Sequence, residues 1–387
     1  MSNRSPERAA VASETINVLK DLIDAPSPSG FEQPAQEVFR AAIAPYADDV
    51  QTDLLGNVYG IVNPGGSPKV MLAGHCDEIG FLVTYINSEG YIYFGPVGGH
   101  DPSIVVGQRV LVHTHDGPLL GVIGRKPVHL MEEEERGRRI NLHDLFIDVG
   151  AKGKAPIAER VAIGDPITFA TGFQTMRDDL AVSHAFDNKI GAYIVAEVIR
   201  LLKGKTISAA VYGVSTVQEE VGLRGAKTSA YWTGATVGLA IDVGHTADYP
   251  SVSKSRVGDL ELGKGPILTR GANTNPEVFK LLREAADKNN IPYQLKADGR
   301  PTGTDANAMQ VNQAGMATGN IAIPLRYMHT PCEVISLTDA DNTALLIAAF
   351  IESITPETDF TPRLSNLHSL SRASSSNNTA SSEKAEH

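Results

Sequence analysis

The hydrophobic positions along the chain predict strands and helices in alternation. Four short apolar runs with the character of buried strands occupy residues 70–73, 209–217, 236–241 and 321–323. Apolar residues at helical spacing predict amphipathic helices over residues 190–202 and 276–288. Strands that alternate with such helices are typical of an α/β fold, with a mixed, largely parallel sheet flanked by helices.

The two ends of the chain add a helix and a tail to this pattern. Helical spacing covers residues 10–22, and Ser29 is predicted to cap a second helix that ends at Ile43. Residues 362–387 are rich in Ser, Asn and Thr and contain few large apolar side chains. Because that composition does not offset the entropy of ordering, it predicts a disordered tail.

Residues 79–173 have a different character, with short β-like runs rich in Gly and Val and no convincing helix between them. We therefore predict a small all-β domain in this segment. It interrupts the α/β domain, which is then made of residues 9–78 and 174–358. The run MEEEERGRR at residues 131–139 mixes acidic with basic side chains and indicates an exposed loop.

Composition narrows the possible partners and the compartment. The chain has 387 residues and a formal net charge of -11, which argues against nucleic acid or an anionic membrane as a partner. No apolar run reaches the ~18–20 residues that span a bilayer, and no secretory signal is visible. Two cysteines do not make a disulfide framework, so we expect a reducing compartment, the cytoplasm. For Cys76 and Cys332 a buried structural role is favoured over metal ligation.

Ionisable residues follow the predicted strands. The first run leads into His75, the second into Glu219 and Glu220, the third into Asp242, and the fourth, after a short loop, into His329. Each local pattern has an ordinary explanation as a turn, a helix cap or a solvated pair. However, the carboxyl ends of parallel strands meet at one edge of a sheet, where ligands of α/β proteins bind. The sequence therefore predicts that these side chains form one site.

The charge of this predicted site indicates metal ions. Asp187, from the Asp-Asn pair just before the helix predicted at residues 190–202, is counted with this site. With Glu219, Glu220 and Asp242 it supplies four negative charges beside two imidazoles, and such a cluster repels itself without cations. Two divalent cations balance it, and mixed His and carboxylate ligands suit zinc, cobalt or manganese. Two metals can share one bridging carboxylate, which leaves one glutamate free to act as a general base. Residue spacing alone leaves open which glutamate that is.

Six motifs then suggest a family. The chain contains GHCDEIGF, FDNKIG, QEEVGLRGA, IDVGHT, PTGTDAN and RYMHTPCEVIS, in this order. Together they resemble the glutamyl and tetrahedral aminopeptidase family of dinuclear metallopeptidases, which includes chains that carry an endoglucanase name. The resemblance extends from about residue 15 to residue 355 and implies an aminopeptidase that removes N-terminal residues from peptides.

The resemblance also implies a role for each site residue. Asp187 would bridge two divalent metals, most readily zinc, with His75 and Asp242 completing one metal site and Glu220 and His329 the other. Glu219 would be the general base.

Further implications concern the surroundings of the metals. Asp77 would orient the imidazole of His75, and the peptide bond after the bridging aspartate would be cis. The inserted β domain would cover the active site and help to build dimers, which in some members assemble into a tetrahedral dodecamer. Residues 301–307 would form a loop near the active site and a subunit contact, or equally a turn followed by a capped helix.

Two alternative functions stay open at this point. The first is a dinuclear deacylase or carboxypeptidase that acts on N-acylated amino acids. The second is a peptide-binding homologue without catalysis, although a full set of ligands and a base argues against it.

Overall fold

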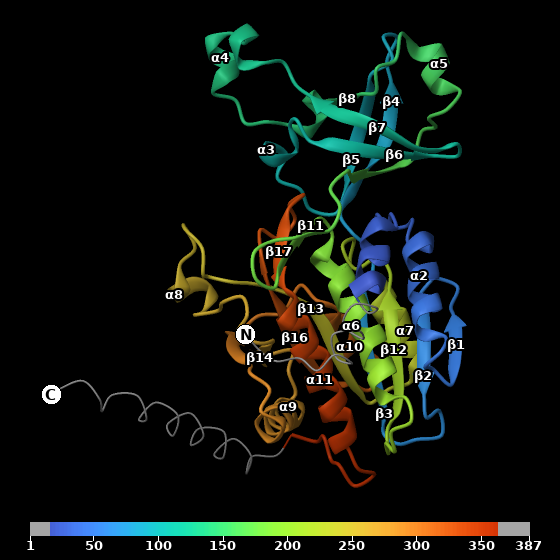
Figure 1. Ribbon diagram of the computed structural model, residues 1–387, viewed down its shortest axis with the longest axis vertical. Coiled ribbons are helices and arrows are strands. Elements are labelled where there is room, and N and C mark those ends of the chain that lie inside the picture. Colours follow the sequence, from blue (N-terminus) through green and yellow to red (C-terminus); the bar gives the residue numbers. More distant parts are fainter. Residues whose placement is uncertain (1–15, 363–387) are drawn as a thin grey trace, which may run out of the picture.

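The computed structural model of the protein describes residues 16–362, and Figure 1 shows a larger α/β lobe below a smaller β lobe. Residues 16–24 are helical, so the described part of the helix expected near the N-terminus is present. The disordered tail expected at residues 362–387 lies outside the described residues, apart from Pro362. None of the helices in the described part is long and apolar enough to cross a membrane.

A mixed sheet forms the centre of the larger lobe. Its four middle strands are parallel and lie in the order β12 (Ala210–Thr216), β3 (Lys69–His75), β13 (Val237–His245) and β16 (Ala317–Arg326). The outer strands are antiparallel, namely β2 (Val58–Val62) and β1 (Asp49–Thr52) on one side, and β17 (Glu333–Ser336), β11 (Leu180–Ser183) and β10 (Gln174–Thr175) on the other. A parallel pair, β14 (Ile267–Gly271) and β15 (Gln294–Asp298), joins β16 through β14. The expected mixed α/β sheet is confirmed, with parallel pairing confined to its centre and to this pair.

Helices cover both faces of this sheet. One face carries α2 (Gln33–Ile43), α6 (Phe186–Leu202), α9 (Pro276–Asn289) and α11 (Leu337–Ser353), and the other α7 (Arg224–Thr233) and α10 (Asp305–Gln310). The central strands are buried except at some of their ends because both faces are covered, which explains their uninterrupted apolar runs. One further turn of helix, α8 (Lys254–Val257), lies on the surface.

The expected helix ends are partly right. Helix α9 begins at Pro276, where the side chain of Asn275 accepts hydrogen bonds from two free backbone N–H groups. Helix α2 ends at Ile43 as expected, but Ser29 does not cap it. The helix begins four residues later, at Gln33, and the Ser29 hydroxyl donates to Oδ2 of Asp77 at 2.7 Å instead.

The smaller lobe is a closed antiparallel barrel. Around it lie β4 (Gly80–Ile86), β5 (Ile92–Val97), β8 (Phe146–Asp148), β7 (Gly117–Gly124), β6 (Arg109–Thr114) and β9 (Pro166–Phe169). Alternate side chains of these strands fill its interior and form a separate core. Short helices α3 (Pro102–Val105), α4 (Glu133–Arg136) and α5 (Lys154–Ala158), with 3₁₀ turns η1 (Val128–Leu130) and η2 (Leu142–Asp144), connect the strands.

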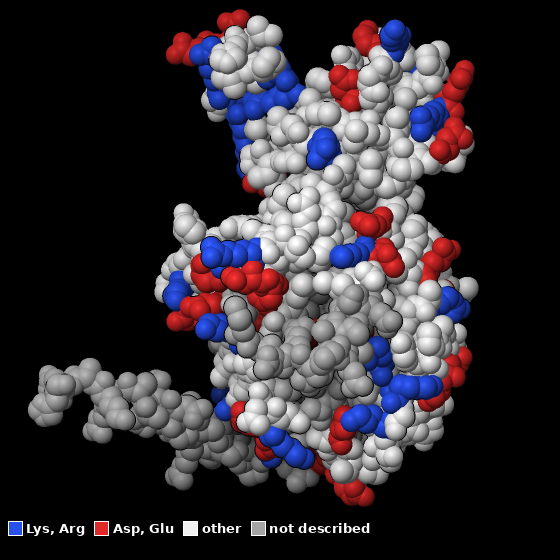
Figure 2. All heavy atoms as spheres, in the orientation of Figure 1, with Lys and Arg blue, Asp and Glu red and all other residues white. Residues whose placement is uncertain are grey.

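One expectation within the barrel lobe was wrong in detail. The run at residues 131–139 contains one turn of helix, α4, because Glu132 and Glu135 cap its N-terminus reciprocally. Its acidic and basic side chains are exposed as expected, apart from Glu135, which is half-buried. Figure 2 shows both signs of charge interspersed on the visible face of the larger lobe, with a group of basic side chains on the barrel lobe below α4.

Candidate metal centre

The expected site residues lie together because several of them follow or end neighbouring strands, and because β3 and α6 pack closely. His75 is the last residue of β3, Asp242 lies in β13, and Glu219 and Glu220 follow β12. A Cβ on Gly74 would lie 2.4 Å from the backbone of Gly191, so only glycine lets β3 and α6 pack this closely. That contact brings the start of α6, which carries Asp187, against the end of β3.

Asp187 lies between the two histidines. Its Oδ1 is 3.5 Å from Nε2 of His75, and its Oδ2 is 3.2 Å from Nε2 of His329. The peptide bond between Asp187 and Asn188 is cis, as the resemblance implied. Asn188 has a structural role, since it donates from Nδ2 to the Ile241 carbonyl and accepts from the Gly191 N–H. Each imidazole therefore faces a different oxygen of one carboxylate.

The remaining carboxylates surround these two imidazoles. Nε2 of His75 is 3.7 Å from Glu219 and 3.8 Å from Asp242, and Nε2 of His329 is 3.5 Å from Glu220. Two sets of residues could each hold a metal ion, because the donor atoms within each set all lie within 4.8 Å of one another. One set is His75, Asp187 and Glu220, and the other is His75, Glu219 and Asp242. Both glutamates thus belong to a potential ligand set, and distance alone does not divide their roles.

The protonation of the cluster reflects crowded negative charge. Burial raises the pKa of Glu219 to about 10 and that of Asp242 to about 7, with repulsion between carboxylates adding to each shift. Hydrogen bonds with Asp187 and then with Glu220 raise the pKa of His329 to about 11. Burial also acts on Asp187, but hydrogen bonds from His329 and His75 outweigh it and hold its pKa low.

The donor set fits divalent cations. In the described part of the chain, the ion-pair partners of Asp187, Glu219, Glu220 and Asp242 are histidines, with no lysine or arginine. Without cations, burial and the neighbouring negative charges raise the pKa values of Glu219, Glu220 and Asp242 and so favour their neutral forms, whereas nearby cations would favour the charged carboxylates. Imidazole nitrogens and carboxylate oxygens are ligands of zinc, cobalt and manganese. These residues could therefore hold divalent metal ions.

Asp77 connects several of the site residues. Its carboxylate accepts the backbone N–H groups of Glu219 and Glu220 at 3.0 and 3.1 Å. Its Oδ1 is 3.4 Å from Nδ1 of His75, while its backbone carbonyl is closer to that nitrogen, at 3.1 Å. Asp77 therefore lies against the imidazole that it was expected to orient, and it also holds the loop of the two glutamates, which sequence reasoning missed.

Glu333 also supports the centre, and the sequence analysis gave it no role. It is buried, and its two carboxylate oxygens accept the backbone N–H groups of Asp187 and His329, each at 2.9 Å. The backbone of His329 has a left-handed angle, as do those of Ala185 and Gln218 nearby, and surrounding contacts must impose this conformation on a residue other than glycine. Glu333 belongs to the motif RYMHTPCEVIS, but only the fold shows which backbone groups it binds.

A buried ion pair supports the same region from behind. Lys189, fully buried two residues after Asp187, donates to Glu78 at 2.7 Å and to the Ala25 carbonyl at 2.7 Å. The other oxygen of Glu78 lies 3.3 Å from Nε2 of His184. Burial opposes ionisation of Glu78, but the charge of Lys189 outweighs it and lowers the pKa of that carboxyl.

Replacing Lys189 by methionine is expected to lower the free energy of unfolding by roughly 3–5 kcal/mol, because it leaves a buried carboxylate without its cation. Urea denaturation of the variant would measure this loss. Lys205→Met is the control, since its pair with Glu352 is half exposed and should contribute less than ~1 kcal/mol. Equal stabilities of the two variants would contradict the importance of the buried pair.

The remaining expectations for this region have mixed outcomes. Cys76 is buried as expected, but Cys332 is exposed and the expectation for it was wrong, because only its neighbours Pro331 and Glu333 face the core. Neither cysteine belongs to the donor sets. Residues 301–307 form a turn that leads into α10, and buried Asp305 accepts a hydrogen bond from Thr216 at the end of β12.

The barrel lobe reaches the metal centre through one loop. A Cβ built on Gly99 would lie 3.6 Å from Nδ1 of His329, and one on Gly98 would lie 3.5 Å from Cβ of Glu220. The next residue, His100, stacks on Phe81 of the barrel and lies 2.8 Å from the Gly80 carbonyl. The barrel thus forms one wall of the centre.

A family model described as M42 glutamyl aminopeptidase matches residues 56–346, and this range contains every residue of the centre. The chain belongs to this family. The lysyl aminopeptidase of Pyrococcus furiosus is 37% identical over 348 residues, which cover 89% of this chain and 99% of that protein.

Two solved structures are similar over nearly their whole length. The TET aminopeptidase of Thaumarchaeota archaeon SCGC AB-539-E09 has a TM-score of 0.85 at 34% identity, covering 93% of this chain and 99% of that one. The Pyrococcus horikoshii TET1 peptidase, which can assemble into a tetrahedron or a large octahedral shell, has a TM-score of 0.79 at 31% identity, covering 88% and 100%. These matches confirm the family expected from the motifs, and this M42 chain is an aminopeptidase with the TET fold.

Proposed function

We propose that the protein is a dinuclear metal-dependent aminopeptidase that removes N-terminal residues from peptides. The observation that carries this proposal is the position of Asp187, whose two oxygens face the imidazoles of His75 and His329 separately. Asp187 is assigned as the bridging ligand. His75 and Asp242 complete one metal site, and Glu220 and His329 the other, with zinc as the first candidate and cobalt or manganese as alternatives.

The metals would polarise the scissile carbonyl, bind the free α-amine and lower the pKa of a water molecule toward ~7. Glu219 is assigned as the general base that takes the proton of the attacking water and passes it to the leaving amine. Its position supports this role, because its carboxylate lies 3.7 Å from Nε2 of His75 and so beside the proposed ligands. Asp77 keeps this base in place through the backbone N–H of Glu219 and orients His75.

One pair of substrates distinguishes an aminopeptidase from the alternative, a dinuclear deacylase or carboxypeptidase. An aminopeptidase requires a free α-amine, so an aminoacyl amide should be hydrolysed and its N-acetylated analogue should not. Preference for the N-acetylated compound would favour the alternative, and hydrolysis of neither compound by metal-loaded protein would favour a peptide-binding homologue without catalysis.

Removal of the metals is expected to abolish turnover, and addition of zinc, cobalt or manganese to restore it. The physical reason is that the two metals compensate the buried carboxylates and supply the charge that stabilises the transition state. Mass spectrometry of the intact protein should count two metal ions per chain before chelation and none after it. Activity that survives complete metal removal would contradict the assignment.

A cavity of about 230 Å³ beside Asp242 is a candidate pocket for the N-terminal side chain. Val243 and Gly244, directly after Asp242, line it, as do the charged residues Lys296, Asp298 and Arg300. Asp298 lies 3.7 Å from Lys296 and also accepts the backbone N–H of Arg300. Two cations against one carboxylate favour an acidic N-terminal side chain.

Lys296→Glu should therefore lower kcat/KM for an N-terminal glutamate at least about tenfold, because like charges then meet in the pocket. The same variant should lose little activity toward an N-terminal alanine. Rates on both substrates would be compared with those of Lys280→Glu, a change at a partly exposed position on α9 that does not line this cavity. An unchanged ratio of the two rates in Lys296→Glu would place the pocket elsewhere.

For the domains and the assembly we propose that residues 79–173 form the inserted lid and dimerisation domain, between catalytic segments 9–78 and 174–358. Gly98 and Gly99 approach Glu220 and His329 closely, which supports the proposal that this domain covers the active site as a lid. The relative described as a tetrahedral or octahedral assembly supports a homo-oligomer, built from dimers and extending to a tetrahedral dodecamer. Light scattering on the purified protein would measure the number of chains.

A further inference from the structure

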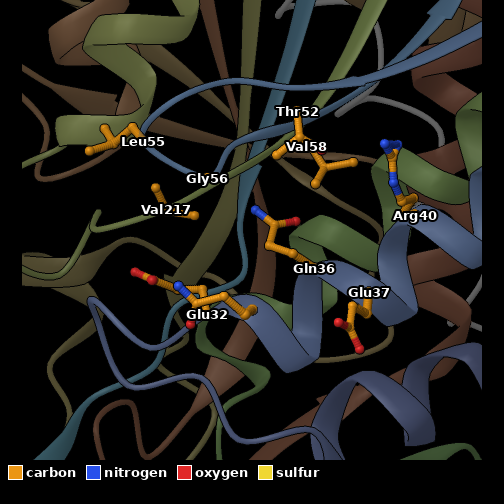
Figure 3. Close-up of a pocket in the computed structure, with 10 residues that line it drawn as sticks. Glu32, Gln36, Glu37, Arg40, Thr52, Leu55, Gly56, Val58 and Val217 are labelled. Atoms are coloured by element: carbon orange, nitrogen blue, oxygen red, sulfur yellow. The ribbon is translucent and has the colours of Figure 1, made fainter.

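A second cavity lies behind the metal centre, between α2 and the first strands of the sheet. Its volume is about 200 Å³, which is small compared with the ~300–1,000 Å³ of drug-sized sites and suits a ligand of a few heavy atoms. Its lining contains none of the proposed metal ligands. Figure 3 shows Gln36 extending from α2 into this space, with Val58 and Thr52 on one side and Val217 on another.

Gln36 has an unused acceptor in this cavity. Its side chain is only 6 % exposed, and Nε2 donates to the Ser215 carbonyl at 2.9 Å. Its Oε1, however, is buried without a hydrogen-bond donor among residues 16–362. Because a buried acceptor without a donor is unfavourable, the cavity calls for a ligand that presents an N–H or O–H group.

Glu32 adds a buried carboxylate to the same cavity. It is 3 % exposed, and its Oε1 accepts the backbone N–H groups of Gly30 at 2.7 Å and Gln218 at 3.1 Å. The described residues include no lysine or arginine paired with it, and burial raises its pKa to about 7. A ligand that carries a positive charge would compensate this carboxylate.

The rest of the lining contains apolar and charged side chains. Leu55, Val58 and Val217 supply apolar surface. Arg40, one more turn along the same side of α2 from Gln36, is exposed and donates one hydrogen bond, to the Val50 carbonyl at 3.4 Å. Figure 3 shows the neighbouring Glu37 turned away from Gln36 and Arg40.

We propose that this cavity binds a free aliphatic α-amino acid. Its ammonium group donates to Glu32 and Gln36, its carboxylate lies toward Arg40, and its side chain packs on Leu55 and Val217.

The position of this site connects it to the reaction. Val217 lies two residues before Glu219, and Glu32 holds the backbone N–H of Gln218. A ligand in the cavity therefore contacts the segment that positions the general base. Free amino acids are the products of an aminopeptidase, so occupancy would report product concentration. This regulatory part rests on the proposed function, whereas binding itself does not.

Calorimetric titration of the metal-loaded full chain with leucine tests the binding. Gln36→Met keeps the volume of the side chain but removes the acceptor, and should weaken this site at least about tenfold. Gln51→Met on β1 is the matched control, because Gln51 is exposed and does not line the cavity. A leucine isotherm that is identical in wild type and Gln36→Met would overturn the proposal.

Two leucine analogues separate the contributions of its charged groups. 3-Methylbutylamine, which keeps the ammonium group, should bind to the site, and 4-methylpentanoate, which lacks it, should not. Arg40→Gln, an exposed change that spares the core, should weaken leucine but not the amine, and it keeps the test valid if Gln36→Met fails to fold. Equal binding of the acid and leucine would overturn the proposal.

The kinetic test uses a peptide substrate at saturation, where leucine no longer competes for the metal centre. Leucine should then change kcat of the wild type several-fold, the usual size of coupling between two sites, and leave kcat of Gln36→Met unchanged. A wild-type kcat that is independent of leucine would overturn the regulatory part. If the protein hydrolyses no peptide, the proposed function fails while the calorimetric result still decides the binding site.

Discussion

Replacing Glu219 by glutamine is expected to lower kcat by ~10²–10⁴-fold, the usual contribution of a positioned general base, while two metals per chain stay bound. The amide keeps the size of the side chain but accepts no proton at neutral pH. The ligands proposed for the metals are other residues, and Asp77 would still accept the backbone N–H at this position. Steady-state kinetics and metal analysis of the same preparation provide the two measurements.

Glu220→Gln is the matched control for this prediction. The two glutamates are adjacent, and both lie within reach of a potential metal. A difference between the two variants therefore reflects the role of each glutamate and not its location. We expect Glu220→Gln to lose metal, because Glu220 lies 3.5 Å from His329 and would complete that site. If Glu219→Gln lost metal and Glu220→Gln lost only turnover, Glu219 would be the ligand and Glu220 the base. Activity of Glu219→Gln within ~10-fold of wild type would exclude Glu219 as the base.

The second large effect is expected for Asp187→Ala, which should lose both metals and all detectable turnover. Asp187 is the carboxylate that faces both histidines, at 3.5 and 3.2 Å, so its removal takes one ligand from each proposed site. Metals that bind the folded but not the unfolded chain would stabilise the fold, each by about 4 kcal/mol when free metal is 1,000 times its Kd. Metal analysis and thermal unfolding with added zinc measure the two losses.

Two comparisons make this result interpretable. Asp116→Ala, an exposed change in the barrel, should keep both metals and the thermal stability of the wild type. Added zinc should raise the melting temperature of the wild type and of Asp116→Ala but not that of Asp187→Ala. A zinc-dependent rise in Asp187→Ala equal to that of the wild type would show that Asp187 is not the bridge.

The alternation of apolar runs and amphipathic helices was sufficient to predict the α/β lobe. Buried parallel strands need continuous apolar side chains on both faces, so β3, β12, β13 and β16 are visible in the sequence itself. The residues His75, Glu219, Glu220, Asp242 and His329 could be selected for the same reason, since ligands lie beyond the ends of such strands. Asp187 follows none of these strands and stood out as part of an Asp-Asn pair before a helix. Charge counting then favoured two cations, whereas the assignment of each residue needed the family resemblance.

Other features depended on contacts between distant segments. The cap expected at Ser29 was wrong because its hydroxyl reaches Asp77, 48 residues away, where a stronger partner outweighs local capping. The support of Asp187 and His329 by Glu333, and the burial of Lys189 against Glu78, likewise join residues far apart in the chain. No local pattern encodes such pairs.

The sequence by itself thus determined the order of elements and the chemical types of the site residues, because both follow from local periodicity and charge. Only the tertiary structure decided how Asp187 lies between two imidazoles, how Asp77 holds the loop of Glu219, and that a cavity with an unpaired acceptor lies behind that loop. Distances between side chains depend on how strands and helices pack, and that packing is set by close approaches such as Gly74 on Gly191.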